Sequence, residues 1–148
     1  MWAVHPGNDT LDNLILYLWQ FAEEFFRATA TRCRVEAPEN IPPHPLSSDL
    51  RHGIFLVVKE AFNNAIKHAR ATEVHLRFKV TRSDFSIAIE DNGHGFHIDA
   101  VNKSSRHGLA NMRRRIEKMG GKIMFSSTPG HGTRIEFVLP LKNYHDAN

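Results

Sequence analysis

The chain has 148 residues, of which 41% are hydrophobic and 24% charged, and its formal net charge is +3. These values are typical of one globular domain that can bury a core. A single cysteine, Cys33, excludes a disulfide framework within the chain. No apolar run approaches the roughly 20 residues that span a bilayer, and the start does not resemble a signal peptide. We therefore expect a cytoplasmic domain, which can still be a piece of a membrane protein.

The first half of the chain is predicted to alternate helix and strand. Apolar residues recur at helical spacing over residues 10–31, and alternation over residues 32–37 predicts a short strand. A proline-rich connection follows over residues 38–47. A second long helix is expected over residues 48–69, with an apolar stripe that faces the core.

The second half is predicted to be rich in strands. We expect an antiparallel pair of strands over residues 74–80 and 85–89, followed by a loop over residues 92–107. A third helix is expected over residues 108–119, and two more strands over residues 122–127 and 133–139. The helix is expected to end at Gly120–Gly121. The whole order predicts an α+β fold, in which one mixed, mostly antiparallel sheet is covered on one face by helices.

The sequence KEAFNNAIKHA in the second helix carries the first group of candidate site residues. At about 100° per residue, Glu60, Asn64 and Lys67 share one stripe, with His68 at its edge. These side chains suit a base, a divalent-cation ligand, a phosphate partner and a ring-stacking group. Taken alone, the stripe is more typical of an ordinary solvated helix face, and only the further stretches favour a site.

The second candidate stretch, DNGHGF, begins where a predicted strand ends. Asp91 has the same parity as the apolar residues of that strand, so its carboxylate should face the covered side of the sheet. A buried carboxylate is costly without a partner, which makes Asp91 a site candidate. Gly93 and Gly95 would let the backbone approach a flat ligand. An ordinary hairpin-end turn explains both glycines but leaves Asp91 unexplained.

Two further stretches contain glycine beside groups that can bind anions or donate hydrogen bonds. In RHGLANM, Gly108 is expected at a helix start, where free N–H groups and the helix dipole favour an anion. In GHGT, Thr133 can donate its hydroxyl into the same pocket. A bare helix start and a plain strand start are the alternatives. From Val101 to Lys122 there are seven Lys or Arg and one acid, which implies a negatively charged partner.

The four stretches in this order resemble the ATP-binding domain of sensor histidine kinases, within the Bergerat-fold (GHKL) ATPases that include gyrase. The resemblance covers about residues 35–141, and it is closest to histidine kinases that are paired with helix-turn-helix response regulators. It implies a two-layer α/β sandwich that binds ATP and Mg²⁺. It also implies transfer of the γ-phosphoryl group of ATP to a histidine.

The resemblance implies a role for each residue that matches a motif. Glu60 would be the catalytic base that orients the nucleophile, and Asn64 would bind Mg²⁺. Lys67 would approach a phosphate, and His68 the adenine or ribose.

At the adenine end, Asp91 would bind the amino group, Gly93 and Gly95 would shape the pocket, and Thr133 would reach the base through water. Residues 96–107 would form a lid over the triphosphate.

The phosphates would be held at the start of the third helix, by Arg106, His107, Gly108 and Leu109. Many relatives have glycine at the position of Arg106, so we expect the lid to differ here, with an arginine that can contact phosphate. The lid is also short.

The phosphoacceptor histidine of this family lies on an upstream helix pair, and no such pair is recognised in this sequence. We therefore expect residues 1–10 to be the remnant of that region, residues 11–141 to be the ATP-binding catalytic domain, and residues 142–148 to be a tail. The implied partners are ATP, the helix pair and a response regulator, but not nucleic acid. The parent protein would be a dimer and can be anchored in a membrane.

Four other functions remain as alternatives. The ten histidines can form a metal site, with His94, His97, His107 and His131 as the nearest candidates, although scattered surface histidines explain them better. The basic segment can bind nucleic acid, although no reading motif accompanies it. The chain can also be a protein-serine kinase of the anti-sigma type, or a pseudo-kinase that binds nucleotide without transfer.

Overall fold

The computed structural model describes residues 10–67, 70–95 and 103–141, and the side chains of Lys103 to Arg106 are outside this description. In chain order its elements are α1 (Leu11–Arg27), β1 (Arg32–Glu36), α2 (Ser48–Lys67), β2 (Glu73–Val80), β3 (Asp84–Asp91), α3 (Lys103–Lys118), β4 (Lys122–Thr128) and β5 (Gly132–Pro140). The predicted order of helices and strands is confirmed. The expected upstream remnant and the C-terminal tail lie almost entirely outside the described residues.

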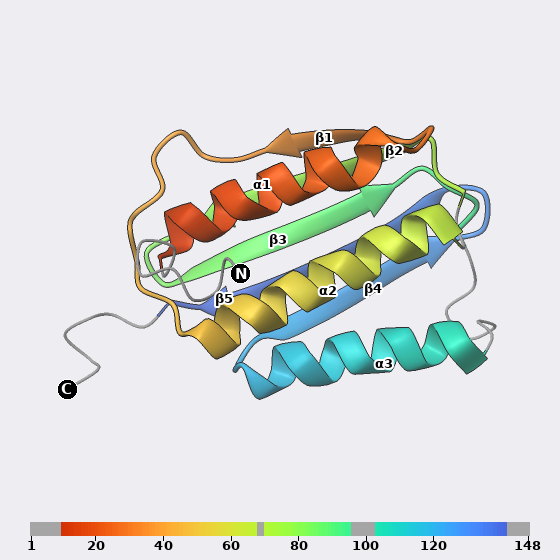
Figure 1. Ribbon diagram of the computed structural model, residues 1–148. Helices are drawn as coiled ribbons and strands as arrows, with labels where there is room; N and C mark the ends of the chain where they lie inside the picture. Colours follow the sequence, from red (N-terminus) through yellow and green to blue (C-terminus); the bar gives the residue numbers. More distant parts are fainter. Residues whose placement is uncertain (1–9, 68–69, 96–102, 142–148) are drawn as a thin grey trace.

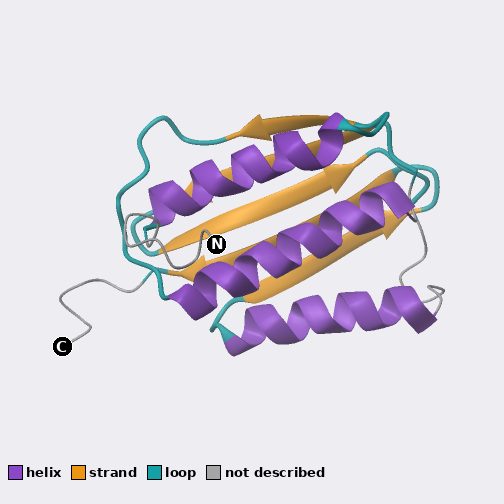
Figure 2. Cartoon of the chain, viewed as in Figure 1, coloured by secondary structure: helices purple, strands orange, loops and turns teal. Residues whose placement is uncertain are grey.

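The five strands form one sheet in the order β1-β2-β3-β5-β4. β1 pairs with β2 in parallel, whereas the other three pairs are antiparallel. All three helices lie on one face of this sheet (Figures 1 and 2). The α+β fold with a mixed, mostly antiparallel sheet under one helical layer is therefore confirmed. Within the described part of the chain, no helix is long and apolar enough to cross a membrane.

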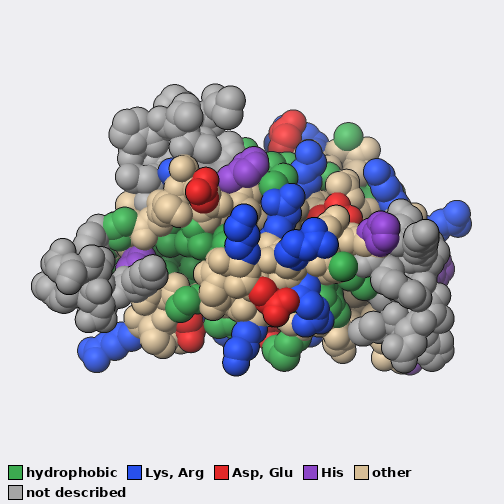
Figure 3. Space-filling view, turned by 90° about the horizontal axis from the view of Figure 1, so that it is seen from below, with side chains coloured by type: hydrophobic (Ala, Val, Ile, Leu, Met, Phe, Trp, Pro, Cys, Tyr) green, Lys and Arg blue, Asp and Glu red, His purple; other side chains and the backbone are tan. Residues whose placement is uncertain are grey.

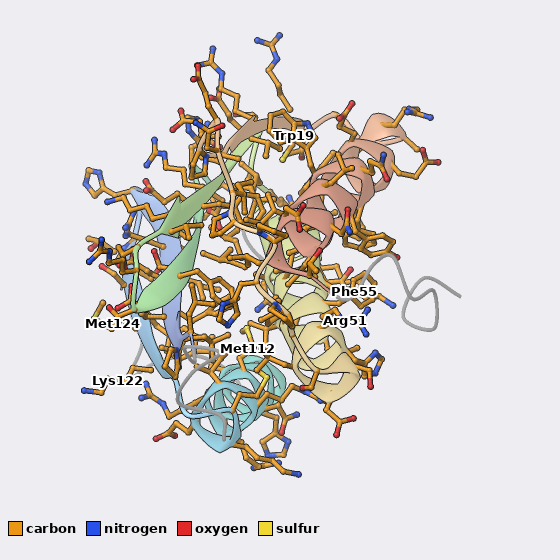
Figure 4. The ribbon with its side chains drawn as sticks, turned by 90° about the vertical axis from the view of Figure 1, so that its left-hand side faces the viewer. Trp19, Arg51, Phe55, Met112, Lys122 and Met124 are labelled. Carbon is orange, nitrogen blue, oxygen red and sulfur yellow. The ribbon has the colours of Figure 1, made fainter. Side chains whose placement is uncertain are left out.

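The core lies between the sheet and the helices, where every second strand residue is buried. The large apolar residues that alternate along the three central strands and are buried on this side are Val74, Leu76, Phe78, Phe85, Ile87, Ile89, Ile135, Phe137 and Leu139. Figure 4 shows Met112 of α3 on this inner side, whereas Lys122 and Met124 lie at the outer side of the sheet. The alternation in the sequence therefore gave the correct buried face for each of these strands.

An aromatic cluster joins α1 to α2 and so fixes the helix that carries the first candidate residues. Phe62 of α2 is fully buried. Its ring centroid lies 4.9 Å from that of Phe26 and 5.5 Å from that of Phe25, both on α1. Removing a buried ring of this kind typically costs about 3–5 kcal/mol of stability. Glu60 and Asn64 are thus carried by a helix that is held firmly on its other side.

The first helix is shorter than predicted, because it ends at Arg27 instead of Thr31. Two threonine hydroxyls hydrogen-bond to the backbone in this segment and compete with the helix. The hydroxyl of Thr29 donates to the carbonyl of Phe26 at 2.8 Å, and the hydroxyl of Thr31 donates to the carbonyl of Ala71 at 2.7 Å. The second of these bonds connects the segment after α1 to the loop that precedes β2.

The third helix is longer than predicted, because it begins at Lys103 instead of Gly108. The loop expected over residues 92–107 is therefore wrong for residues 103–107. Glycine within a helix costs about 1 kcal/mol relative to alanine, but each further helical residue adds a hydrogen bond, so the helix extends through Gly108. The predicted end is confirmed: Gly120 has a φ of +86°, and the N–H of Gly121 donates to the carbonyl of Ile116.

The face of the sheet that the helices leave open carries a network of alternating charges. Arg77 of β2 contacts Glu36 of β1 at 3.3 Å and Glu90 of β3 at 2.6 Å. Arg134 of β5 contacts Glu90 as well, and Glu136 at 3.1 Å. This charged face joins four neighbouring strands and keeps them in register, with charged groups toward solvent and apolar groups toward the helices.

Candidate functional site

The predicted polar stripe of α2 lies beside the buried stripe, as the helical spacing indicated. Glu60 and Asn64 are half-buried and Lys67 is exposed, whereas Ala61 and Ala65 next to them are buried. A carboxylate and an amide, one helical turn apart, are therefore held at the margin of the core. His68, the fourth predicted member of this stripe, lies outside the described residues.

The carboxylate of Glu60 lies directly against Gly108 of α3. A β-carbon at position 108 would lie 2.8 Å from Oε1 of Glu60. The absence of a side chain at this position therefore lets α3 approach α2 closely. From the sequence we expected a different role for this glycine, namely a free N–H group at a helix start.

That prediction about the helix start is wrong. Only the first four N–H groups of a helix lack a partner within it. Because α3 begins at Lys103, those groups belong to residues 103–106, and Gly108 and Leu109 lie deeper in the helix. Leu109 is half-buried and packs against the core. Of the predicted lid, residues 103–107 are helical, and residues 96–102 lie outside the described residues.

A cleft of about 500 Å³ separates α2 from α3 and contains Glu60. The polar residues that line it are Lys59, Glu60, Asn63, His107, Asn111 and Arg115. The predicted His107 is therefore part of this cleft. Lys59, Asn63, Asn111 and Arg115 were missed, although His107, Asn111 and Arg115 stand four residues apart, which is the spacing of one helix face.

The exposed surface of α3 is strongly basic, and one of its basic residues, Arg115, lines the cleft. Arg113, Arg114, Arg115 and Lys118 of α3 are all exposed. Figure 3, seen from the side on which α3 lies in Figure 1, shows Lys and Arg side chains gathered over this face. The guanidinium of Arg113 lies over the ring of Phe125, 5.3 Å from its centroid. This surface supports the expectation of a negatively charged partner.

The second predicted centre, Asp91, is the last residue of β3, where it pairs with Thr133 of β5. The carboxyl group is half-buried, and burial raises the pKa of Asp91 above its ordinary value. Hydrogen bonds from the backbone N–H groups of Gly93 and Thr133 act against this rise in pKa. The Gly93 N–H lies 2.9 Å from Oδ1. The carboxyl group is thus partly withdrawn from water and held in one orientation.

The glycines near Asp91 allow the backbones of two turns to pack closely against each other. Gly95 has a φ of +67°, and a β-carbon there would lie 2.1 Å from the carbonyl oxygen of Thr128. Gly132 has a φ of +86°, and its β-carbon would lie 2.0 Å from the carbonyl oxygen of Asp91. The backbone of another turn thus occupies the space beside the α-carbon of Gly95, and that Gly95 also lets a flat ligand approach stays a prediction. Gly93 is buried.

Thr133 lies beside Asp91, with only 9% of its surface exposed. Both residues line a small pocket of about 140 Å³ at the ends of β3, β4 and β5. The Thr133 hydroxyl lies 3.0 Å from the hydroxyl of Ser127 on β4. Sequence reasoning missed Ser127, which becomes visible only once the register of β4 and β5 places it opposite Thr133.

The two centres do not share a lining residue among the described parts of the chain. Glu60 belongs to the cleft between α2 and α3, and Asp91 belongs to the end of the sheet. The described residues also contain no group of three or more His, Cys, Asp or Glu side chains that could hold a metal ion. Of the four histidines in the metal alternative, His97 lies outside this description.

Comparison with known proteins adds to this geometry. Residues 49–143 match the family described as histidine kinase-, DNA gyrase B- and HSP90-like ATPase. Over 96 residues the chain is 33% identical to the sensor histidine kinase LiaS of Bacillus subtilis, which covers 65% of this chain and 26% of that protein. It is 31% identical over 103 residues to the histidine-protein kinase/phosphatase DegS of Brevibacillus brevis. This match covers 70% of this chain and 25% of DegS.

Two solved structures share the fold. The ATP-binding domain of PrrB from Mycobacterium tuberculosis is 24% identical, with a TM-score of 0.66 over 90% of this chain and 96% of that one. The blue-light activated histidine kinase EL346 of Erythrobacter litoralis is also 24% identical, with a TM-score of 0.72 over 89% and 43%. The chain spans about a quarter of the length of the curated relatives described above.

Proposed function

Because the chain belongs to the family of histidine kinase-, DNA gyrase B- and HSP90-like ATPases, we propose that it is the Mg-ATP-binding catalytic domain of a sensor histidine kinase. The observation that carries the proposal is the half-buried Asp91, oriented by two backbone N–H groups at the end of the sheet. An ionised carboxylate can only accept hydrogen bonds, which suits the exocyclic amine of adenine. The family relationship names the nucleotide, and this carboxylate supplies its recognition.

The adenine end of the site would consist of Asp91 and Thr133, with Gly93 and Gly95 holding the loop. Asp91 would accept from the amino group, and the hydroxyl of Thr133 would reach the neighbouring ring nitrogen, directly or through a water. The two side chains are paired across β3 and β5, so the distance between them is set by the sheet. The fold therefore prepares this part of the site before the ligand arrives.

The phosphate end would lie toward α2 and α3. Asn64 offers an amide oxygen and Glu60 a carboxylate, both half-buried, and such oxygen donors fit Mg²⁺. We assign the Mg²⁺ to Asn64; when bound, it would neutralise charge on the phosphates. Lys67 and the free N–H groups of residues 103–106 would support the same phosphates, and His68 would lie near the adenine or ribose. In this proposal Arg106 acts from the first turn of α3, and His107 from the adjoining cleft.

The reaction would transfer the γ-phosphoryl group of ATP to a ring nitrogen of a histidine. The bond from phosphorus to the β–γ bridging oxygen breaks, a phosphorus–nitrogen bond forms, and ADP leaves. Glu60 would orient the imidazole and accept its proton. The place of Glu60 in the cleft beside Gly108 supports this role, because the acceptor side chain can approach there between α2 and α3.

The acceptor histidine would belong to a helix pair outside this chain, and the phosphoryl group would pass on to a response regulator. The parent would be a dimer. LiaS and DegS are histidine kinases, and this similarity favours a histidine acceptor over the serine acceptor of anti-sigma kinases.

Titration calorimetry of this chain with ATP, in the presence and absence of Mg²⁺, tests the nucleotide site. We expect saturable binding that Mg²⁺ strengthens, loss of most affinity in Asp91→Asn, and full affinity in the control Ser86→Ala. Ser86 is a half-buried residue of β3, on the open face of the sheet. No binding at millimolar ATP would overturn the proposal.

The acceptor is tested by adding the helix-pair domain of the parent protein together with labelled ATP. We expect label on that domain that is lost in acid and stable in alkali, as a phosphohistidine is. Acid-stable label would instead indicate a serine acceptor.

A further inference from the structure

We propose that Asn92 is a positioning residue for base recognition, whose amide group holds the turn after β3 so that the Asp91 carboxylate keeps one orientation. The inference rests on the proposed function, because it assumes that the amino group of adenine meets Asp91. It goes further by assigning a role to a residue that is not among those lining the small pocket of Asp91 and Thr133.

The side chain of Asn92 is bonded to the segment where β2 begins. Its Oδ1 atom accepts from the backbone N–H groups of Thr72 and Glu73, each at 2.9 Å. Its Nδ2 group donates to the hydroxyl of Thr72 at 2.8 Å. The backbone N–H of Asn92 also donates to the carbonyl of Glu73 at 3.2 Å. Both the backbone and the side chain of Asn92 are therefore held by the same two residues.

The direction of each of these bonds follows from its atoms. A backbone N–H can only donate, so the Asn92 atom that meets two of them is the amide oxygen, and the remaining NH₂ group is the donor to Thr72. An alanine at position 92 can form none of the three side-chain bonds. Of the four bonds, it would keep only the backbone bond to Glu73.

The turn that Asn92 holds contains a donor that orients Asp91. The N–H group of the next residue, Gly93, lies 2.9 Å from Oδ1 of Asp91. This N–H belongs to the peptide plane between Asn92 and Gly93, so the backbone dihedral angles of these two residues set its direction. The three side-chain bonds restrict rotation at Asn92, and they thereby keep the Gly93 N–H directed at the carboxylate.

A carboxylate that is oriented before the nucleotide arrives loses less conformational entropy when the amino group of adenine donates to it. In Asn92→Ala the bond from Gly93 should be weaker and the Asp91 carboxylate more free to rotate. The part of the affinity that depends on the amino group should therefore fall, whereas the contacts to the rest of the nucleotide remain.

The first test needs no nucleotide. The pKa of Asp91 is measured by NMR from its carboxyl carbon signal, in the native chain and in Asn92→Ala. The hydrogen bond from Gly93 lowers the pKa of Asp91, so weakening this bond should raise the pKa in the variant. A loss of stability alone would leave the pKa of the folded chain as it is. An unchanged or lower pKa would overturn the inference.

The second test is a cycle of two proteins and two nucleotides. ATP and purine riboside 5′-triphosphate, which lacks the amino group, are titrated by calorimetry in the presence of Mg²⁺. We expect Asn92→Ala to lose about fivefold in ATP affinity and less than about twofold in affinity for the analogue. Equal losses, or none, would overturn the inference. Absence of ATP binding by the native chain would overturn the proposed function, and the titration of Asp91 distinguishes that failure from a failure of the Asn92 contact.

Thr81→Ala is the matched control. The Thr81 hydroxyl holds the turn at the opposite end of β3, where it accepts from the N–H groups of Ser83 and Asp84 at 3.3 and 3.1 Å. This variant should leave the pKa of Asp91 and the preference for ATP unchanged. If Asn92→Ala fails to fold, Thr72→Val removes only the bond from Nδ2. It should shift both quantities in the same direction by a smaller amount, and no shift would overturn the inference.

Discussion

A β-carbon on Gly108 would lie 2.8 Å from the Oε1 atom of Glu60. The proposed catalytic carboxylate therefore packs against α3 at a position that has no side chain. No other atom of Glu60 would be as close, since its carboxyl carbon would lie 3.7 Å away. The end of a flexible side chain can move, whereas the backbone of α3 is held by its helix. A larger residue at position 108 would therefore displace the carboxylate and leave the fold in place.

We predict that Gly108→Ala separates stability from activity. Replacing a glycine within a helix by alanine should maintain the free energy of unfolding or raise it by up to about 1 kcal/mol. Phosphoryl transfer should fall by about tenfold or more, because Glu60 is moved from its position. Urea unfolding and transfer to the helix-pair domain measure the two effects.

Ala110→Gly is the matched control for this helix. Ala110 is exposed and outside the cleft, so the variant should lose about 1 kcal/mol of stability and keep its activity. Unchanged transfer in Gly108→Ala would contradict the contact between Gly108 and Glu60 as a requirement for catalysis.

We predict that two glycines of one turn differ strongly in their tolerance of alanine. Gly130 and Gly132 have similar positive φ values, +82° and +86°. A β-carbon on Gly130 would meet nothing within 4 Å. Gly130→Ala should therefore lose only about 1–2 kcal/mol of stability, which is the cost of the left-handed backbone conformation for alanine. Gly132→Ala adds a clash with the Asp91 carbonyl, and should lose a further about 1–3 kcal/mol or more.

Equilibrium unfolding in urea measures both losses, and ATP titration shows whether the same clash disturbs the nucleotide pocket. We expect weaker binding in Gly132→Ala and native affinity in Gly130→Ala. Equal destabilisation of the two variants would contradict the close contact between the turns.

We predict that Asp91→Asn loses nucleotide affinity while it maintains or gains stability at neutral pH. Burial raises the pKa of Asp91 above its ordinary value of 3.8. Stability contributed by a carboxyl group with a raised pKa is fully present below pH 3.8 and is lost as the pH rises through the folded-state pKa. At pH 7 the native chain thus carries an unfavourable buried charge that the variant lacks.

Unfolding measured between pH 3 and pH 8 should show a flatter pH dependence in Asp91→Asn than in the native chain. ATP affinity should fall by about 10- to 100-fold at pH 7, because a charged hydrogen bond to the amine is lost. A variant that is less stable than the native chain at pH 7, with identical pH dependence, would refute the burial argument.

We predict that Asn64→Ala removes the dependence of ATP binding on Mg²⁺ more than it removes binding itself. The ratio of the dissociation constants without and with Mg²⁺ should approach one, while the affinity without Mg²⁺ changes by less than about twofold. Asn63 is the alternative amide, since it lines the cleft with Glu60. Loss of the Mg²⁺ effect in Asn63→Ala, with the effect intact in Asn64→Ala, would reverse the assignment.

The sequence by itself determined the elements and most of their faces. Strand alternation identified the buried side of β2, β3 and β5, and helical spacing separated Glu60 and Asn64 from the apolar stripe of α2. The parity of Asp91 also indicated a partly buried carboxylate. These features are local, because the period of the chain decides which side chains share a face.

Only the tertiary structure decided why the glycines are present and which residues support the site. Gly108 was predicted as a helix start, but it lies within α3, where its missing side chain leaves room for the Glu60 carboxylate of α2. Gly95 is required by the carbonyl of Thr128. Ser127 became relevant only through its place opposite Thr133. The reason is physical: each of these roles depends on an atom from a distant part of the chain, at a distance that only the packed sheet and helices define.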